Sequence, residues 1–486
     1  MFRSITATMG RDRDYPARQF TLDVYGRVLN GALYDHMPHG FHQEKTENGD
    51  YVPLRDRRPG VRYNLCRLVV EDSVSLLFSE GHFPTPKSED AATGAAAQAL
   101  IKHGRLNAVM LEAATIGSVG SAAVQMQVLK AAEGDGYRVF FKPFSTEFLT
   151  PRFSPQDPDR LAGIREQYKV KGADLAASGY GVAQDDLAED FWFAREWDAV
   201  CETWITPWKV CDGDAGAGRV DEARSVRHDL GFVPWVWIRN LPGRLKLLPM
   251  GGGFGGGGAA GYSDIDGACT FEAAVETMIE IEYQLSQAGR GLKYSMDPTL
   301  LLKEPARDLG EFVKSPANAL VVDAGGDAKM LEIGGSAFSV VLDYVRALRE
   351  FALEAAHGSR ADASRLSAAQ SGRAMELMNQ ALIWLADRLR VSYGEGALLS
   401  LLRMALKAHE TFPLVVGGEV LALERAGGLS LSWPAWHMPT SRDLQEQATT
   451  VVALTAAGVM SKETAVRTIA GNYDVEDVVG ELQRVG

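Results

Sequence analysis

The chain has 486 residues, which is long enough for a large core and for more than one domain. Hydrophobic residues make up 46% and charged residues 23%, and no run of about eighteen apolar residues could span a bilayer. The net charge of -13 argues against broad affinity for nucleic-acid phosphates, which requires an excess of Lys and Arg. Residues 1–20 lack the apolar core of a signal peptide, so we expect no export.

The cysteines and the N-terminal arginines give two local expectations. Four cysteines are too few to cross-link this chain and match no zinc-binding spacing, so we expect reduced core residues at Cys66, Cys201, Cys211 and Cys269. Residues 1–70 hold eleven Lys or Arg against eight Asp or Glu, a local charge of +3. Most of this charge comes from Arg55, Arg57, Arg58, Arg62 and Arg67, and a solvated face is favoured over a DNA-binding patch.

The first half of the chain mixes helix and strand patterns. The expected elements are a helix over 64–79, strands over 124–128 and 137–141 with a turn at 134–136, a short helix near 160–168, a strand pair within 191–208 and a strand over 232–239. The glycine tract 251–258 lacks the strand and helix that flank a dinucleotide-binding loop, so a surface loop is expected there.

Two amphipathic helices stand out in the second half. The first, 271–287, has an acidic edge at Glu272, Glu276 and Glu280, and no Lys or Arg before residue 288 offsets it within the helix. The second begins near Ser336 as its N-cap and ends at residues 357–358. Residues 291–335 between them contain strand patterns at 300–302, 319–322 and 330–333, the last two joined by a turn at 325–327.

A polar loop follows the second helix, and the remainder of the chain is mostly helical. Helices are expected over 371–393, 397–410, 442–456, 461–470 and 476–484, with strands over 414–423 and 429–433. Taken together, the mixture of elements indicates an α+β fold.

Signatures of chemistry are few. The chain lacks the P-loop, the nucleophile elbow and the HExxH pattern, so it shows no ATPase or hydrolase signature of its own. His36, His39 and His42 stand three apart beside Asp35 and Glu44, but proline and glycine interrupt them, so an ordinary loop is favoured over a metal site. No His or nucleophile is placed with the three carboxylates of the acidic edge, so a solvated or lumen-facing helix side is favoured over acid–base catalysis.

Several stretches in order along the chain carry a family resemblance. They are RVLNGALYDH, NLCRLVVEDSVSLLFSEG, GFVPWVWIRNLP, SAAQSGRAMELMNQALIWLADRL and PTSRDLQEQATTVVALTAAGVMSKETAVRTIAG. With them the chain resembles the portal proteins of tailed bacteriophages, the head-to-tail connectors of the siphophage type. The glycine tract and the aromatic density over 191–208 depart from that pattern.

The resemblance implies a portal-type subunit with named parts. These are a wing over 1–262 and 371–439, stem helices over 263–290 and 336–356, a small α/β clip over 291–335, a tunnel loop over 357–370 and a helical crown over 440–486. It implies a homo-oligomeric ring, usually a dodecamer, that forms a DNA channel at one capsid vertex. Double-stranded DNA is packaged and ejected through such a ring.

The resemblance also implies partners and site residues. The partners are further copies of the chain, major capsid and scaffolding proteins, the terminase and then the head–tail adaptor, in the virion and in the host cytoplasm during assembly. No enzymatic activity, cofactor, metal or membrane contact is expected. The implied residues are Arg360, Ser364 and Arg365 at DNA, Glu272, Glu276 and Glu280 lining the channel, and Phe271, Val275, Met278, Phe338 and Val345 between subunits.

The residues allow a stem hairpin of this kind, because a ring would bury apolar stripes between neighbours and leave an acidic edge for the lumen. Two other hypotheses stay open from the sequence. One is a metal-dependent enzyme that uses His36, His39 and His42 with Asp35 or Glu44. The other is a portal of prophage or gene-transfer-agent origin.

Overall fold

The computed structural model describes most of the chain. The described residues are 1–79, 81–131, 136–211, 218–242, 265–296, 299–305, 322–331, 336–358, 379–423, 425–436, 441–470, 480, 482 and 484. They form a mixed α and β structure that separates into two compact units. Unit 1 comprises Met1–Val70, Ser118–Gly120 and Ala268–Ala356, and unit 2 comprises Glu71–Gly117, Ser121–Gly267 and His357–Gly486.

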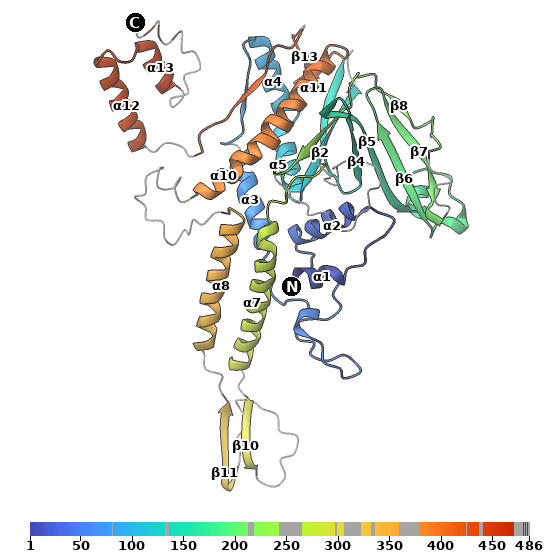
Figure 1. Ribbon diagram of the computed structural model, residues 1–486, viewed down its shortest axis with the longest axis vertical. Coiled ribbons are helices and arrows are strands. Elements are labelled where there is room, and N and C mark those ends of the chain that lie inside the picture. Colours follow the sequence, from blue (N-terminus) through green and yellow to red (C-terminus); the bar gives the residue numbers. More distant parts are fainter. Residues whose placement is uncertain are drawn as a thin grey trace. The chain divides into compact units, whose positions relative to one another are not determined.

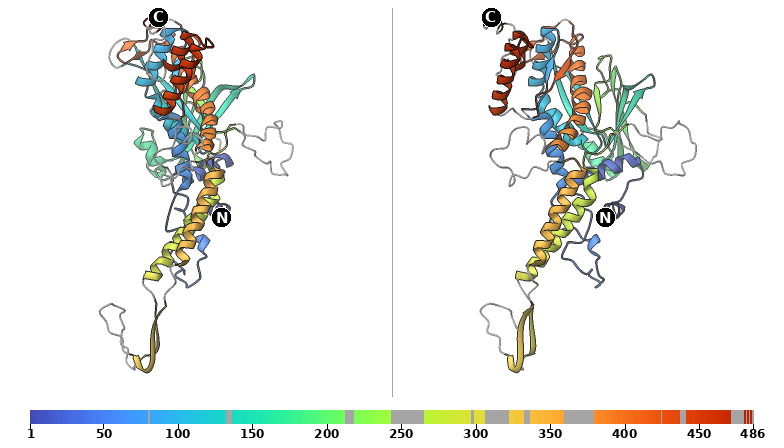
Figure 2. Two further views of the ribbon diagram at one scale, coloured as in Figure 1. Left: turned by 90° about the vertical axis from the view of Figure 1, so that its left-hand side faces the viewer. Right: turned by 60° about the vertical axis from the view of Figure 1, so that its left-hand side comes forward.

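Unit 1 is largely helical. Its elements are α1 (Phe2–Ala7), α2 (Ala17–Leu29), the 3-10 turn Leu54–Asp56, the first residues of α3 (Leu65–Phe78), the 3-10 turn Glu272–Ala274, α7 (Val275–Met296), β10 (Thr299–Pro305), β11 (Val322–Leu331) and α8 (Ser336–Ala355). Helices α7 and α8 run side by side, and the antiparallel pair β10–β11 continues beyond their ends (Figures 1 and 2). The resemblance assigns residues 1–70 to the wing, whereas here they group with this helical hairpin.

The core of unit 1 lies where the start of α7 meets the N-terminal helices. Phe271, Val275 and Met278 are at most 2% exposed, and the ring of Tyr25 in α2 packs edge-to-face on Phe271 with centroids 6.1 Å apart. Burial of large apolar side chains supplies most of the stabilisation of such a core. These residues therefore pack the start of α7 onto the N-terminal helices of the same unit.

Unit 2 contains two antiparallel sheets and a set of helices. A five-stranded sheet has the order β4 (Leu149–Ser154), β5 (Asp157–Lys171), β6 (Asp190–Trp197), β7 (Cys201–Lys209) and β8 (Val226–Arg227). A three-stranded sheet has the order β3 (Tyr137–Ser145), β2 (Ser121–Lys130) and β9 (Trp235–Arg239). Trp197 and Trp235, with ring centroids 4.9 Å apart, join the two sheets in one apolar cluster.

The remaining elements of unit 2 are short strands and helices. They are the end of α3, β1 (Thr85–Lys87), α4 (Ala91–His103), α5 (Leu106–Gly117), α6 (Gly172–Ala177), the 3-10 turn Gln184–Asp186, α10 (Gln380–Leu389), α11 (Leu399–His409), β12 (Val415–Val416), β13 (Glu419–Val420), β14 (Ser430–Ser432), α12 (Ser441–Ala456) and α13 (Lys462–Ala470). Thr464 donates its backbone N–H to the Ser461 hydroxyl, which caps α13 as the sequence predicts.

A π-helix, Arg390–Leu398, joins α10 to α11. Its Tyr393 is fully buried and donates a hydrogen bond of 2.9 Å to the Asn240 amide oxygen. Gly394 lies against the Trp433 ring, where an added Cβ would come within 2.2 Å of a ring carbon. A side chain at this position would therefore displace the tryptophan.

Several expected elements are confirmed by the structure. These are the helix at 64–79, the strand pair β2–β3, the strand pair β6–β7, both helices of the hairpin, α11 and the helices α12 and α13. The positive φ of 54° at His357 ends the second hairpin helix where the sequence predicts a stop. The glycine tract 251–258, residues 359–370 of the expected tunnel loop 357–370, and residues 371–378 at the start of the next expected helix lie outside the described residues.

Other expectations were wrong. Residues 160–168 are not a helix but part of β5, because that segment pairs with β4 and β6 on both sides and Glu166 receives an ion pair of 2.6 Å from Arg195 on β6. Residues 325–327 are not a turn but lie within β11, which pairs with β10. The first hairpin helix continues to Met296, beyond its expected end at 287.

Two side-chain expectations also need correction. Cys66 and Cys269 are buried free thiols as expected, but Cys211 is exposed. Arg57 does not belong to a solvated face: it is 2% exposed and donates to the Val52 carbonyl from Nε and Nη2. Among the helices in the described part of the chain, none has both the length and the apolar character needed to cross a bilayer.

Candidate functional site

The α7–α8 hairpin of unit 1 is the candidate functional site, because it carries the predicted stem, the predicted channel lining and the predicted subunit contacts. Its two helices differ in what surrounds them. α7 is covered by the N-terminal segment of the same chain, whereas much of α8 is exposed. The polar contacts of α7 and the exposed face of α8 therefore define two different surfaces.

The acidic edge of α7 has partners from elsewhere in unit 1. Glu272 accepts a hydrogen bond of 2.7 Å from the Tyr25 hydroxyl. Glu276 accepts from the N-terminal ammonium of Met1 at 3.0 Å and from the Phe2 backbone N–H at 3.2 Å. Glu280 accepts from the Gln284 amide at 2.7 Å. As expected, no Lys or Arg within the helix offsets this edge; Glu272 and Glu276 have partners from α2 and from the N-terminal residues, and Glu280 bonds to Gln284 of α7 itself.

One acidic residue that the sequence analysis missed lies at the centre of unit 1. Glu282 is 2% exposed and accepts three hydrogen bonds, from the Tyr34 hydroxyl at 2.5 Å and from the backbone N–H groups of Tyr63 and Asn64 at 3.0 Å each. Asn64 has a positive φ of 40°, so a backbone conformation that is rare for non-glycine residues occurs at the end of this network. Glu282 thereby joins α7 to Tyr34 and to residues 63–64, which lie before and after the segment 55–62 that contains four arginines.

Burial sets the electrostatics of this network. Removal of the Glu282 carboxyl from water raises its pKa, and the three donated hydrogen bonds offset only part of that effect. Burial and the nearby carboxylate raise the pKa of the Tyr34 hydroxyl far above its ordinary value, so Tyr34 stays a neutral donor. Burial likewise raises the pKa of the Cys66 and Cys269 thiols, which makes them poor nucleophiles.

The outer face of α8 carries an uncovered apolar stripe. Val340, Tyr344 and Phe351 are 67%, 48% and 63% exposed, and their spacing places them on one side of the helix. Large apolar side chains gathered in this way mark an interaction surface more often than singly scattered ones do. We call Val340, Tyr344 and Phe351 the α8 stripe.

The α8 stripe was missed in the sequence because the second helix has two apolar sides. One apolar series at helical spacing predicts the inward side of this helix, and its members are half-buried or buried in the structure: Phe338, Val341, Leu342, Val345, Leu348 and Ala352. A second series at 340, 344, 347 and 351 also has helical spacing, which is the signal that could have found the α8 stripe.

The predicted subunit contacts fall into two groups. Phe271, Val275 and Met278 are already buried by residues of the same unit, so a neighbouring subunit is not needed to cover them. Phe338 and Val345 on α8 are half-buried and retain accessible surface. The first three are therefore part of the unit 1 core, and their contact with a neighbouring subunit stays a prediction.

The other predicted site residues are placed as follows. Arg360, Ser364 and Arg365 lie outside the described residues. His36 bonds through Nε2 to the Thr8 hydroxyl at 2.9 Å, and the backbone of His39 bridges to Arg57. Across the described ranges, which include 35–44, no three His, Cys, Asp or Glu side chains are grouped as metal ligands would be, so the histidine cluster does not converge.

Comparison with known proteins adds no relative: no model of a protein family matches the chain, and no curated protein matches it.

Proposed function

We propose that this chain is the subunit of a ring-shaped portal through which double-stranded DNA passes at one vertex of a viral capsid. The α8 stripe carries the proposal, because three large apolar side chains lie exposed on a hairpin helix about 30 Å long. A ring of identical subunits would place the stripe against the neighbouring hairpin and remove it from water. The five sequence stretches that resemble portal proteins support the same conclusion.

The remaining parts of the proposal follow the resemblance. Residues 291–335, which include the pair β10–β11, would bind the packaging terminase and later the head–tail adaptor, and capsid and scaffolding proteins would surround the ring. Arg360, Ser364 and Arg365 would contact DNA. A net charge of -13 suits a channel in which DNA slides without being retained. The chain itself would perform no catalysis, and a partner ATPase would supply the energy for packaging.

The first test concerns ring formation. The triple variant Val340→Asp, Tyr344→Asp, Phe351→Asp is expected to remove rings from negative-stain images and to shift mass photometry towards single chains. Charged groups on the stripe would have to be desolvated in the contact. The control Arg346→Glu with Arg349→Gln changes the net charge equally on exposed positions of the same helix and should keep rings. Loss of rings in both variants, or no rings of the wild-type chain under any condition, contradicts the proposal.

The second test concerns DNA. Arg360→Glu with Arg365→Glu is expected to leave rings intact and to reduce packaging in a reconstituted system, because it reverses two charges that would face phosphates. The control Arg346→Glu with Arg349→Glu makes the same change of charge on α8. Normal packaging by the loop variant would remove these arginines from the DNA contact.

A further inference from the structure

A cavity of about 600 Å³ lies within unit 2, between the two sheets and the helix α11. One wall consists of residues from the end of β4, the start of β5 and the strand β9, and the other wall consists of α11 with the end of the π-helix. Phe232, together with Val236 and Trp237 of β9, contributes apolar surface to the lining. Its size and lining are within the range of ligand sites, which are mostly apolar with a few polar groups. We call this cavity the α11 groove.

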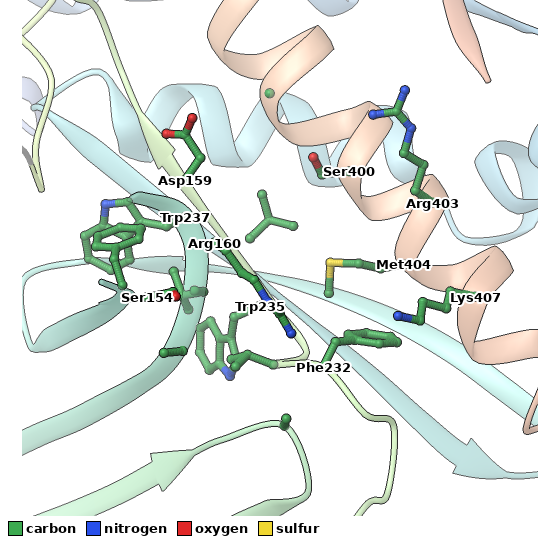
Figure 3. Close-up of a pocket in the computed structure, with 17 residues that line it drawn as sticks. Ser154, Asp159, Arg160, Phe232, Trp235, Trp237, Ser400, Arg403, Met404 and Lys407 are labelled. Atoms are coloured by element: carbon green, nitrogen blue, oxygen red, sulfur yellow. The ribbon is translucent and has the colours of Figure 1, made fainter. Parts of the chain in front are cut away.

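Positive charge predominates around the α11 groove. Arg160 on β5 and Arg403 and Lys407 on α11 line it, against the single carboxylate of Asp159. All three cations have exposed side chains. Figure 3 shows Arg160 and Lys407 directed from opposite walls towards the space beside Phe232. This concentration of cations occurs in a chain whose net charge is -13, so it is a local departure from the overall charge.

The cations of the groove have no anionic partner in the part of the chain that the structure describes. Arg403 donates to the Leu429 carbonyl at 3.1 Å, and the Lys407 ammonium lies 5.5 Å from the centre of the Phe232 ring. Neither these two side chains nor Arg160 forms an ion pair with a described carboxylate. Like charges on facing walls repel one another, so an anion between them would relieve that repulsion.

The groove is elongated along α11. Its lining includes Gly396, Ser400, Met404 and Lys407, which lie on one side of the helix over about 15 Å. That length corresponds to about five residues of extended chain. Met404 projects towards Trp235, and the two form the apolar middle of the groove (Figure 3).

From this geometry we propose that the α11 groove binds an extended acidic peptide segment of a partner protein, with one aromatic or aliphatic side chain inserted beside Phe232, Trp235 and Met404. Carboxylates of the segment pair with Arg160, Arg403 and Lys407. An acidic peptide fits better than a nucleic acid, because the overall charge of -13 repels a long polyanion whereas a short peptide experiences mainly the local charge. The proposal does not depend on the portal function.

The test measures peptide binding to the purified full-length chain by fluorescence anisotropy. The probes are fluorescein-labelled six-residue peptides in which two or three Asp or Glu residues flank one Phe, Tyr, Trp or Leu. Two matched sets replace either the acids by Asn and Gln or the apolar residue by Ser. The acidic peptides that contain the apolar residue are expected to bind. Both matched control sets are expected to bind at least about tenfold more weakly.

Variants of the chain locate the site. Arg403→Glu with Lys407→Glu should weaken binding at least about tenfold, and Ser400→Trp should block it by filling the groove without a change of charge. The control Lys102→Glu with Arg388→Glu makes the same change of charge at exposed positions outside the groove and should bind normally. Circular dichroism melting curves verify that each variant is folded.

Several outcomes would overturn the proposal. They are no binding of any acidic peptide up to about 1 mM, equal binding of the neutral set, or binding that both groove variants leave unchanged. Tighter binding of a single-stranded oligonucleotide that the same variants abolish would reassign the groove to nucleic acid.

Discussion

The two helices of the unit 1 hairpin have similar lengths and different surroundings. The start of α7 is enclosed: Phe271 is fully buried, and Tyr25, Tyr34 and the N-terminal residues donate to its carboxylates. α8 contributes only part of its apolar surface to the same unit and leaves Phe351 63% exposed. The difference shows that the start of α7 packs against other segments of its own unit, whereas α8 leaves large apolar side chains exposed.

The largest expected effect contrasts two phenylalanines on these helices. Phe271→Ala should lower the free energy of unfolding of unit 1 by about 4 kcal/mol, since it opens a cavity in a closed core. Phe351→Ala should change it by no more than about 0.5 kcal/mol in the unassociated chain. All nine tryptophans lie in unit 2, so hydrogen exchange of α7 amides is the suitable measurement. Equal losses for the two variants would erase the contrast between the helices.

The next effect concerns the buried carboxyl. Glu282→Ala should destabilise unit 1 by about 3 kcal/mol, because the Tyr34 hydroxyl and the N–H groups of Tyr63 and Asn64 lose their acceptor. Glu280→Ala is the matched control on the same helix: it removes one bond to Gln284 and should cost at most about 0.5 kcal/mol. Hydrogen exchange of α7 amides measures both, and a similar cost for the two would show that the network adds no stability.

The same carboxyl predicts a pH dependence. Burial raises the pKa of Glu282 above its ordinary value of 4.5. As pH rises above 4.5, the unfolded chain therefore loses this proton before the folded chain does, and stability falls until the folded pKa is passed. Glu282→Gln should remove that part of the decline. Hydrogen-exchange protection of α7 amides, measured at pH 4.5 and pH 7.5 in the wild type and in Glu282→Gln, isolates the part of the decline that is due to Glu282. The same decline in both proteins would contradict the attribution to Glu282.

The smallest expected effect is at the exposed acidic edge. Glu276→Gln should cost less than about 1 kcal/mol, because its ion pair with the Met1 ammonium is accessible to water and screened by salt. The loss should shrink as salt is added. Arg346→Gln, which breaks the exposed ion pair with Asp343 on α8, serves as the control and should leave exchange of α7 unchanged. A large loss that salt does not alter would mean that Glu276 is as important as Glu282.

Much of the secondary structure was readable because it depends on neighbours in sequence. Apolar residues at helical spacing predicted α3, α7, α8 and α11, and a serine at position 461 predicted the cap of α13. The failures occurred where distant residues decide the conformation. Residues 160–168 are a strand because β4 and β6 pair with them, and their own residues carry no strong preference that would reveal this.

The candidate site divides in the same way. Sequence periodicity located both helices of the hairpin and its acidic edge, and the family resemblance pointed to a function for them. Neither the periodicity nor the resemblance indicated that Tyr25 and the N-terminal residues would cover that edge or that Glu282 would be buried. Neither indicated that residues of β5, β9 and α11 would form one groove.

The sequence alone therefore determined which segments of this protein are helices with an apolar side, because a helix forms from contacts three and four residues apart. Tertiary structure decided which of those apolar sides are covered by other parts of the chain. α7 found its partners in residues about 250 positions earlier, as the bond between Tyr25 and Glu272 shows, and the α8 stripe found none within the described part of its unit. Contacts across such separations depend on how the chain packs, which local periodicity does not record.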